Sequence, residues 1–126
     1  MKKKKSVTPC PCGSGKDLDQ CCRPYMDGSL SAPTAEALMR SRYTAYALQD
    51  SQYLLDSWHA STRPESIDLD PALQWIRLRI LNSNGNHVEF VASYRLQGRA
   101  HSLHENSRFV FEDGNWFYVD GVLMAG

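Results

Sequence analysis

The sequence lacks any long apolar run. No segment of the 126 residues approaches the roughly 20 apolar residues of a membrane-spanning helix. Lys2 to Lys5 precede no apolar stretch and therefore do not begin a signal peptide. Internal repeats and long low-complexity tracts are also absent. These absences predict a cytoplasmic protein with no membrane span, built as one domain with a small appendage.

The chain has no net charge overall, but its charged residues are unevenly distributed. Residues 1–24 carry six Lys or Arg against two Asp, which gives +4, and residues 25–126 carry eight Arg against twelve Asp or Glu, which gives −4. The basic end could contact an acidic surface such as RNA, lipid or an acidic protein. Alternatively, Lys2 to Lys5 form a solvated tail.

Cysteine is absent from the chain outside one short stretch. A C-x-C pair and a C-C pair enclose eight small or polar residues, a loop too short to bury a core of its own. Four thiolates can surround Zn²⁺ as a tetrahedron, whereas two disulfides would require a vicinal bridge or two cross-pairings within thirteen residues. We predict one structural zinc ion per chain, because four protein ligands leave no position for water. The ligands are Cys10, Cys12, Cys21 and Cys22.

The run C-P-C-G-S-G-K-x-x-x-x-C-C resembles the SEC-C motif, a zinc element of the SecA translocase and of several bacterial accessory proteins. The resemblance implies protein contacts, including chaperone and ribosome contacts, without chemistry at the metal. The first functional hypothesis is therefore a non-enzymatic protein-interaction module or adaptor with an unidentified protein partner. If the loop is a separate knob, Cys12→Ser should disorder it and leave the body folded.

The segment after the cysteines predicts a connection followed by two helices. Residues 23–33 are rich in turn formers and read as an extended stretch held by Tyr25, Met26 and Leu30. Thr34 can cap a helix over 35–49, and Asp50 or Ser51 can cap a shorter one ending near Trp58. The apolar face of the longer helix collects Ala35, Leu38, Met39, Tyr43 and Tyr46.

The second half of the chain predicts a β-meander. Residues 60–72 read as a loop, after which the hydrophobic period becomes two. The first strand would present Ile76, Leu78 and Ile80 on one face, and the next strand Val88, Phe90, Ala92, Tyr94 and Leu96. The remaining strands are expected near 101–112 and 115–120, joined by the turn Asp113-Gly114.

This order of elements predicts an α+β fold. A small N-terminal zinc-binding loop, residues 1–24, would precede a domain over 25–126 with two helices packed on a curved antiparallel sheet of about four strands. The order resembles the cone-like fold of the nuclear transport factor two superfamily. That resemblance implies a pocket between the sheet and the helix it wraps.

Several runs of the body resemble the YchJ-like family of uncharacterised bacterial proteins. They are L-M-R-S-R-Y-T-A-Y from 38 to 46, S-W-H-A-S-T-R-P from 57 to 64, H-E-N-S-R-F from 104 to 109, and D-G-N-W-F-Y-V-D-G from 113 to 121. The family implies the fold and the zinc module and supplies no established reaction.

Polar residues within the apolar patterns allow two interpretations. Arg42, Glu105, Ser107 and Asp120 interrupt faces expected to be buried. In a structural network, Arg42 or Arg108 would pair with Glu105 or Asp120. In a ligand pocket they would surround a small molecule, and the protein would be a binding protein or an enzyme. The candidate pocket residues are Arg42, Tyr46, Trp58, Tyr94, Glu105 and Asp120; no catalytic residue is assigned.

Other motifs are weaker indications of function. Gly13-Ser-Gly-Lys16 lacks the first glycine, the preceding strand and the following helix of a phosphate loop, so we expect Lys16 to lie exposed beside the thiolates. The histidines His59, His101 and His104 have no carboxylate at diagnostic spacing and are expected to be structural. A weaker hypothesis is RNA or ribosome contact through Lys2 to Lys5, Lys16 and Arg23.

Overall fold

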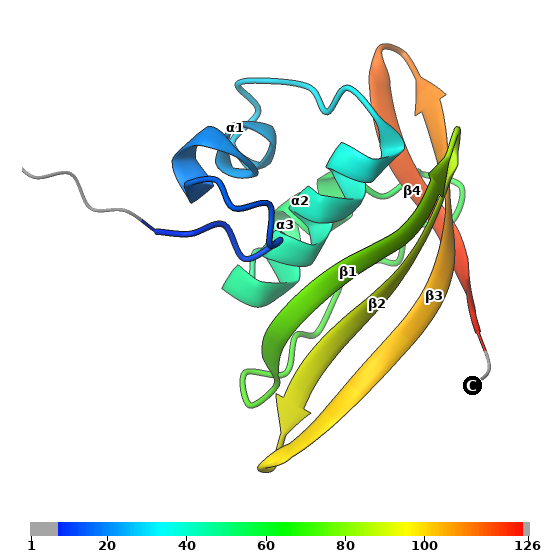
Figure 1. The fold of residues 1–126 in the computed structure, drawn as a ribbon. Coiled ribbons are helices and arrows are strands. Elements are labelled where there is room, and N and C mark those ends of the chain that lie inside the picture. The colour runs from blue at the N-terminus through cyan, green and yellow to red at the C-terminus, as the bar shows by residue number, and fades with distance from the viewer. Residues whose placement is uncertain (1–7, 125–126) are drawn as a thin grey trace, which may run out of the picture.

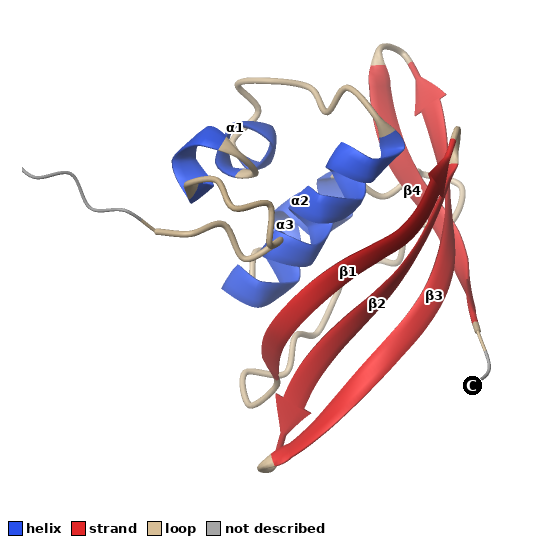
Figure 2. Ribbon diagram, in the orientation of Figure 1, coloured by secondary structure: helices blue, strands red, loops and turns tan. Residues whose placement is uncertain are grey.

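A computed structural model describes residues 8–124, in which helices cover one face of a four-stranded antiparallel sheet (Figures 1 and 2). The strands follow each other in the order β1-β2-β3-β4, so the sheet is a simple meander. This arrangement confirms the predicted α+β fold class. The elements are a 3₁₀ turn η1 (Leu18–Gln20), helices α1 (Arg23–Met26), α2 (Ala35–Leu48) and α3 (Ser51–Asp56), and strands β1 (Gln74–Asn84), β2 (His87–Leu96), β3 (Arg99–Glu112) and β4 (Asn115–Leu123).

Side-chain caps set where the two main helices begin. Thr34 Oγ1 accepts a 3.0 Å hydrogen bond from the Ala37 amide at the start of α2. Asp50 Oδ1 accepts a 3.1 Å hydrogen bond from the Tyr53 amide at the start of α3. Between the helices Gln49 adopts a left-handed conformation with φ 62°, which ends α2. The predicted caps are thus confirmed, with Asp50 capping the shorter helix.

The connection after the cysteines is partly helical, which corrects the predicted extended stretch. Arg23–Met26 form α1, because Pro24 lies in the first turn, where a missing N–H and a preset φ suit a helix. Tyr25 and Met26 pack against the core as expected. Leu30 does not, since it is 60% exposed.

Strand β1 contains a bulge that changes which residues face the helices. The β1–β2 register shifts between Trp75 and Arg77, so Ile76 is an extra residue in the ladder. Ile76 is consequently 49% exposed, and its predicted place on the buried face is wrong. Trp75 instead joins Leu78 on the side of the sheet that faces the helices.

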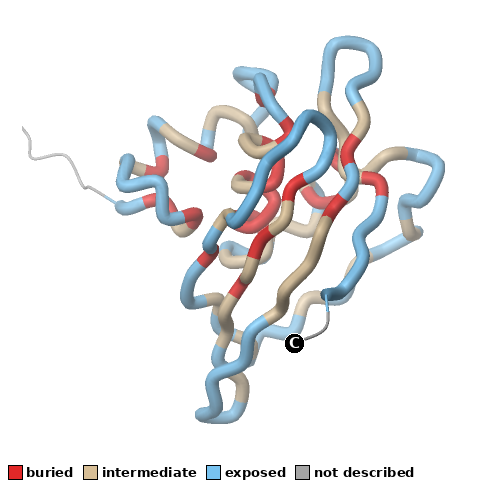
Figure 3. Tube along the Cα trace, turned by 45° about the vertical axis from the view of Figure 1, so that its right-hand side comes forward, coloured by how far each residue is buried: buried red, intermediate tan, exposed pale blue. Residues whose placement is uncertain are grey.

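Helix α2 lies between the N-terminal loop and the sheet (Figure 1). Buried positions concentrate along the contact between the helices and the sheet and extend into the loop (Figure 3). The core therefore runs from Cys12 and Leu18 through Leu38 to Phe90 and Phe109. No helix between residues 8 and 124 is long and apolar enough to cross a membrane.

Candidate metal centre and ligand cavity

The four cysteines converge on one point. Their Sγ atoms all lie within 4.8 Å of one another, and all four cysteines are free. Cys12 Sγ lies 3.7 Å from Cys21 Sγ, which lies 4.0 Å from Cys22 Sγ. A tetrahedral ion with metal–sulfur bonds of about 2.3 Å requires sulfurs about 3.8 Å apart. The cluster therefore fits a metal ion held by four thiolates.

The backbone of the loop brings the cysteines together. The Cys10 amide donates to the Lys16 carbonyl at 2.9 Å, and the Gly13 amide donates to the Cys10 carbonyl at 3.1 Å. Gly13 and Gly15 close this turn with φ of 81° and 87°, a region that favours glycine. The G-S-G segment between the cysteine pairs thus shapes the metal site.

The pKa values of the thiols shift in different directions. Hydrogen bonds from the Cys10 and Cys22 thiols lower the pKa of Cys12, and hydrogen bonds to Cys10 and Cys12 raise the pKa of Cys22. Burial raises the pKa of Cys21. Because metal binding requires thiolates, it must displace protons from this cluster.

The cysteine loop shares the core of the body. Cys10, Cys12 and Cys22 are buried in the same cluster as Leu38 and Tyr43. Cys10 Sγ lies 3.6 Å from Thr44 Oγ1, and Arg40 Nη1 donates a 2.9 Å hydrogen bond to the Cys12 carbonyl. Two neighbouring turns of α2 therefore hold the loop, so we expect loss of the metal to disturb α2 as well.

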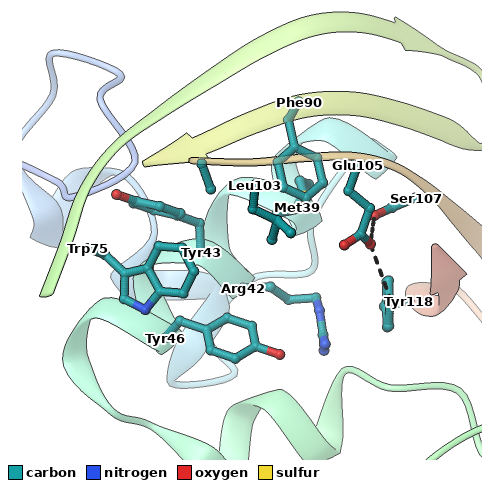
Figure 4. Close-up of a pocket in the computed structure, with 11 residues that line it drawn as sticks. Met39, Arg42, Tyr43, Tyr46, Trp75, Phe90, Leu103, Glu105, Ser107 and Tyr118 are labelled. Atoms are coloured by element: carbon teal, nitrogen blue, oxygen red, sulfur yellow. Dashed lines mark hydrogen bonds between the residues drawn. The ribbon is translucent and has the colours of Figure 1, made fainter. Parts of the chain in front are cut away.

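A separate cavity lies where α2 faces the sheet (Figure 4). Its volume is about 270 Å³, and most of its wall is apolar or aromatic. Arg42, Tyr46 and Glu105 are the predicted pocket residues that the structure brings together in this wall. The other lining residues are Met39, Tyr43, Trp75, Phe90, Ala92, Leu103, Ser107 and Tyr118.

Arg42 is the positively charged residue in the wall of this cavity. The residue is only 3% exposed, and its Nη1 donates to the Leu54 carbonyl at 2.8 Å and to Ser57 Oγ at 2.7 Å. The guanidinium carbon lies 5.0 Å from the centre of the Trp58 ring and 4.5 Å from that of Tyr118. Burial lowers the pKa of Arg42. Aromatic faces and carbonyl dipoles therefore hold a buried cation.

Glu105 is the second charged residue in the wall. Its Oε2 accepts a 2.7 Å hydrogen bond from Ser107 Oγ and a 3.5 Å one from the Tyr118 hydroxyl. Arg42 and Glu105 do not form an ion pair among the contacts of residues 8–124. Of the pairings that the predicted network allowed, Arg42 with Glu105 is therefore not formed, whereas Arg108 with Asp120 is formed.

Asp120 lies outside the cavity, which corrects its predicted place on a buried face. The β3–β4 register shifts after Arg108, which pairs with Asp120, whereas Phe109 pairs with Tyr118. Val119 is thus an extra residue, so it is buried and Asp120 turns outward. Asp120 forms a 2.9 Å ion pair with Arg108 in which both side chains are about half exposed.

Trp58 and Tyr94 lie behind the cavity wall and do not line it. Trp58 meets Tyr118 edge-on with ring centres 5.0 Å apart, and Tyr94 packs on Trp75 at 5.3 Å. Both aromatics thus support residues that do line the cavity. Tyr118 and Trp75 were not among the predicted pocket residues, because their alternation in the strands indicated no chemistry.

The histidines contact neither site. His59 Nε2 lies 2.6 Å from Glu112 Oε1, and His104 Nε2 lies 2.7 Å from Glu89 Oε2. His101 is exposed and stacks on Tyr94.

Lys16 and Arg23 are exposed near the cysteines, with Arg23 3.6 Å from Asp19. Lys2 to Lys5 lie outside the described residues, so RNA contact through this basic end stays a prediction.

Comparisons with known proteins agree with both halves of this architecture. Residues 34–121 match the family model "YchJ, middle NTF2-like domain", and residues 8–24 match the SEC-C motif. A UPF0225 protein from Polaromonas naphthalenivorans is 50% identical over 132 residues, covering 91% of this chain and 97% of the relative. The chain belongs to the YchJ-like family.

Two solved structures are similar to this YchJ-like protein. A SEC-C motif containing protein from Rhodopseudomonas palustris has a TM-score of 0.81 and 36% identity, with 94% of this chain and all of that chain covered. A second one, from Psychrobacter arcticus, has a TM-score of 0.72 and 22% identity, with 96% and 85% covered, and supports the fold alone. The YchJ-like fold therefore combines the SEC-C loop with the sheet and helices.

Proposed function

We propose that this YchJ-like protein binds a small organic molecule in the cavity beneath α2, while a structural zinc ion in the cysteine centre holds that helix in place. The observation that carries the proposal is Arg42, a buried cation with donors left over. A guanidinium has five N–H donors, and the two hydrogen bonds in the described part of the chain use only Nη1.

The remaining donors of Arg42 are on Nε and Nη2, which form no hydrogen bond with residues 8–124. Every side-chain nitrogen or oxygen sealed within residues 8–124 has a hydrogen-bond partner. Because Nε and Nη2 have none, they are not fully enclosed by these residues, and Arg42 lines the cavity. Keeping a cation buried without a carboxylate is costly for folding, which favours a role in binding.

Zinc suits the cysteine centre because four thiolates in a closed tetrahedron are a common structural zinc site. Such an ion would supply a cross-link between the C-x-C turn, the C-C pair and, through them, helix α2. Metal analysis of purified protein should find about one zinc per chain. A content near zero with oxidised thiols would contradict this part of the proposal.

A binding screen tests the cavity. Wild-type protein labelled with ¹⁵N would be mixed with a library of small organic acids, alcohols and amines, and chemical shifts would be followed. Molecules that bind should shift signals of Arg42, Ala92 and Glu105. Ala92→Leu, which adds a side chain inside the cavity wall, should remove binding, whereas Ala100→Leu on an exposed position should not. No shift at the cavity for any compound would contradict the function.

A second candidate function is the adaptor role indicated by the SEC-C motif. A groove of about 300 Å³ runs beside Cys21, the least buried of the four cysteines, and its wall includes Lys16, Gln20 and Arg40. These groups suit an acidic segment of a protein partner. In a pull-down, Lys16→Glu should lose partners that wild type and the exposed control Arg79→Glu retain. Identical partners for all three would contradict the adaptor role.

A further inference from the structure

The charges in the cavity wall also indicate which kind of small molecule fits, an inference that rests on the proposed function. We propose that the ligand is a small organic acid that also carries a hydroxyl or amino group. The acid oxygens would accept hydrogen bonds from Arg42, the hydroxyl or amino group would donate to Glu105, and an apolar body would lie against the aromatic wall.

Arg42 defines the end that binds the acid group. Its Nε and Nη2 share one edge of the planar guanidinium, the geometry that holds a carboxylate through two parallel hydrogen bonds. The Trp58 and Tyr118 rings and the Nη1 bonds to α3 fix the orientation of that edge. Little side-chain freedom remains to be lost on binding, so the group is preorganised for an anion.

Glu105 defines the end that binds a donor. Both of its hydrogen bonds within residues 8–124 go to Oε2, and Oε1 has no protein donor there. A carboxylate only accepts hydrogen bonds, so a group that complements Oε1 must bring a hydrogen. Figure 4 shows the Glu105 carboxylate, with Ser107 and Tyr118 on one side, directed into the space beside Arg42 and Leu103.

The rest of the wall sets the size and polarity of the ligand. Met39, Trp75, Phe90, Ala92 and Leu103 provide a mainly apolar surface. The volume of about 270 Å³ lies just below the roughly 300–1,000 Å³ typical of sites for drug-sized ligands. A ligand with one aromatic ring or a short branched chain is therefore the right size.

Molecules that lack either polar group leave part of the site without a partner. A neutral apolar molecule would cover the Arg42 donors without accepting from them. An acid with no donor would leave Glu105 Oε1 without a hydrogen-bond partner. Both losses are absent for the proposed ligand class.

Isothermal titration calorimetry with matched probes tests this inference on the full, zinc-loaded chain. The probes share one aromatic ring: 3-phenyllactate and phenylalanine carry acid and donor, 3-phenylpropionate carries the acid alone, and 2-phenylethanol the donor alone. We expect 3-phenyllactate or phenylalanine to bind at least tenfold more tightly than either single-group probe. The comparison of those two distinguishes a hydroxyl from an amino group.

Two conservative variants test which side chain binds the acid group and which binds the donor. Arg42→Lys should weaken every acid at least tenfold, and Glu105→Gln should reduce the advantage of 3-phenyllactate or phenylalanine over 3-phenylpropionate, leaving 3-phenylpropionate unchanged. The exposed controls Arg79→Lys and Glu65→Gln should leave all affinities unchanged. If Arg42→Lys does not fold, as judged by its ¹⁵N spectrum, the probe series and Glu105→Gln still test the proposed ligand class.

The outcomes for the inference and for the proposed function are separable. Equal affinity of 3-phenylpropionate and the two-group acids, or no binding of any acid probe, would overturn the ligand class. If library compounds of another class still shift cavity signals, small-molecule binding stands without this ligand class. If no compound does so, the proposed function fails as well.

Discussion

The cysteine centre and the cavity lie on different faces of α2, and they differ in how far their polar groups are paired. Around the cysteines, Thr44, Arg40 and the loop backbone make closed contacts, and four thiols face one another. In the cavity, Arg42 and Glu105 each keep hydrogen-bonding capacity that no residue between 8 and 124 uses. One side of the helix therefore has its polar groups paired, whereas the other retains donors and acceptors that could serve the proposed ligand.

We expect the largest loss of stability when the metal centre is broken. Structural zinc can contribute on the order of 10 kcal/mol, comparable to the roughly 5–15 kcal/mol stability of a whole domain. Because Cys12 is completely buried in the shared core, we expect Cys12→Ser or zinc removal by a chelator to unfold α2 as well as the loop. Near-ultraviolet circular dichroism would measure this. Native packing in the metal-free body would instead support a separable knob.

High pH tests the burial of α2 between the two sites. Burial raises the pKa of Tyr43 from 10.0 to about 12. Tyrosine in the unfolded chain loses its proton first, so the stability is intact below pH 10 and falls as pH rises through 12. The loss is at most about 2–3 kcal/mol. Urea unfolding at pH 9 and pH 12 should show it, and Tyr43→Phe should reduce the difference. An equal pH effect in both proteins would contradict this assignment.

The same substitution in the packed core and in the cavity wall should have opposite effects on stability. Ala35 is 1% exposed in the packed core, so Ala35→Leu should cost about 1–3 kcal/mol through overpacking. Ala92 lines the cavity, so Ala92→Leu should be neutral or add about 0.5–1 kcal/mol by filling space. Urea unfolding compares the two. Equal destabilisation would mean that the cavity offers no room for the added side chain.

Gly121 tests the position of Glu105. A Cβ at residue 121 would overlap the Glu105 carboxylate, so Gly121→Ala should displace that side chain and break its bond to Ser107. We expect a loss of about 1–2 kcal/mol in urea unfolding. In the background Glu105→Ala the same change should cost nothing measurable. A full cost in that background would show that the strain is elsewhere.

Substitution of Asp120 should have the smallest effect of these changes, in contrast to substitution of Glu105. Its exposed pair with Arg108 contributes about 0–1 kcal/mol, so Asp120→Asn should change stability by no more than that. Affinity for 3-phenyllactate should not change, whereas Glu105→Gln should lower it. Calorimetry with the same acid probes measures both. A loss of affinity in Asp120→Asn would show that this residue contributes to the ligand site.

Local signals in the sequence predicted most of the fold because their causes are local. Thr34 and Asp50 mark helix starts by side-chain hydrogen bonds, and the Asp113-Gly114 turn joins two strands whose alternation was visible. The cysteine spacing likewise predicted a cluster, because only short loops separate the four thiols.

Other features could not be predicted from the sequence, because they depend on contacts between segments that are far apart in the chain. The extra residues Ile76 and Val119 each shift the alternation of a strand by one, which brings Trp75 inward and turns Asp120 outward. Such bulges depend on pairing with the neighbouring strand and leave no mark in a hydrophobic pattern. The contacts of Arg42 with Leu54 and Ser57 depend similarly on how α3 packs.

The central claim, a ligand site at Arg42 beside a purely structural metal centre, is tested most directly by one titration. The Arg42 Nε–H signal and the backbone amides of residues 10–22 would be followed in ¹⁵N spectra of zinc-loaded protein as 3-phenyllactate is added. We predict that the Arg42 signal shifts together with the amides of Glu105 and Tyr118, while the amides of the cysteine loop stay in place. Shifts confined to the cysteine loop, with Arg42 unchanged, would contradict the account.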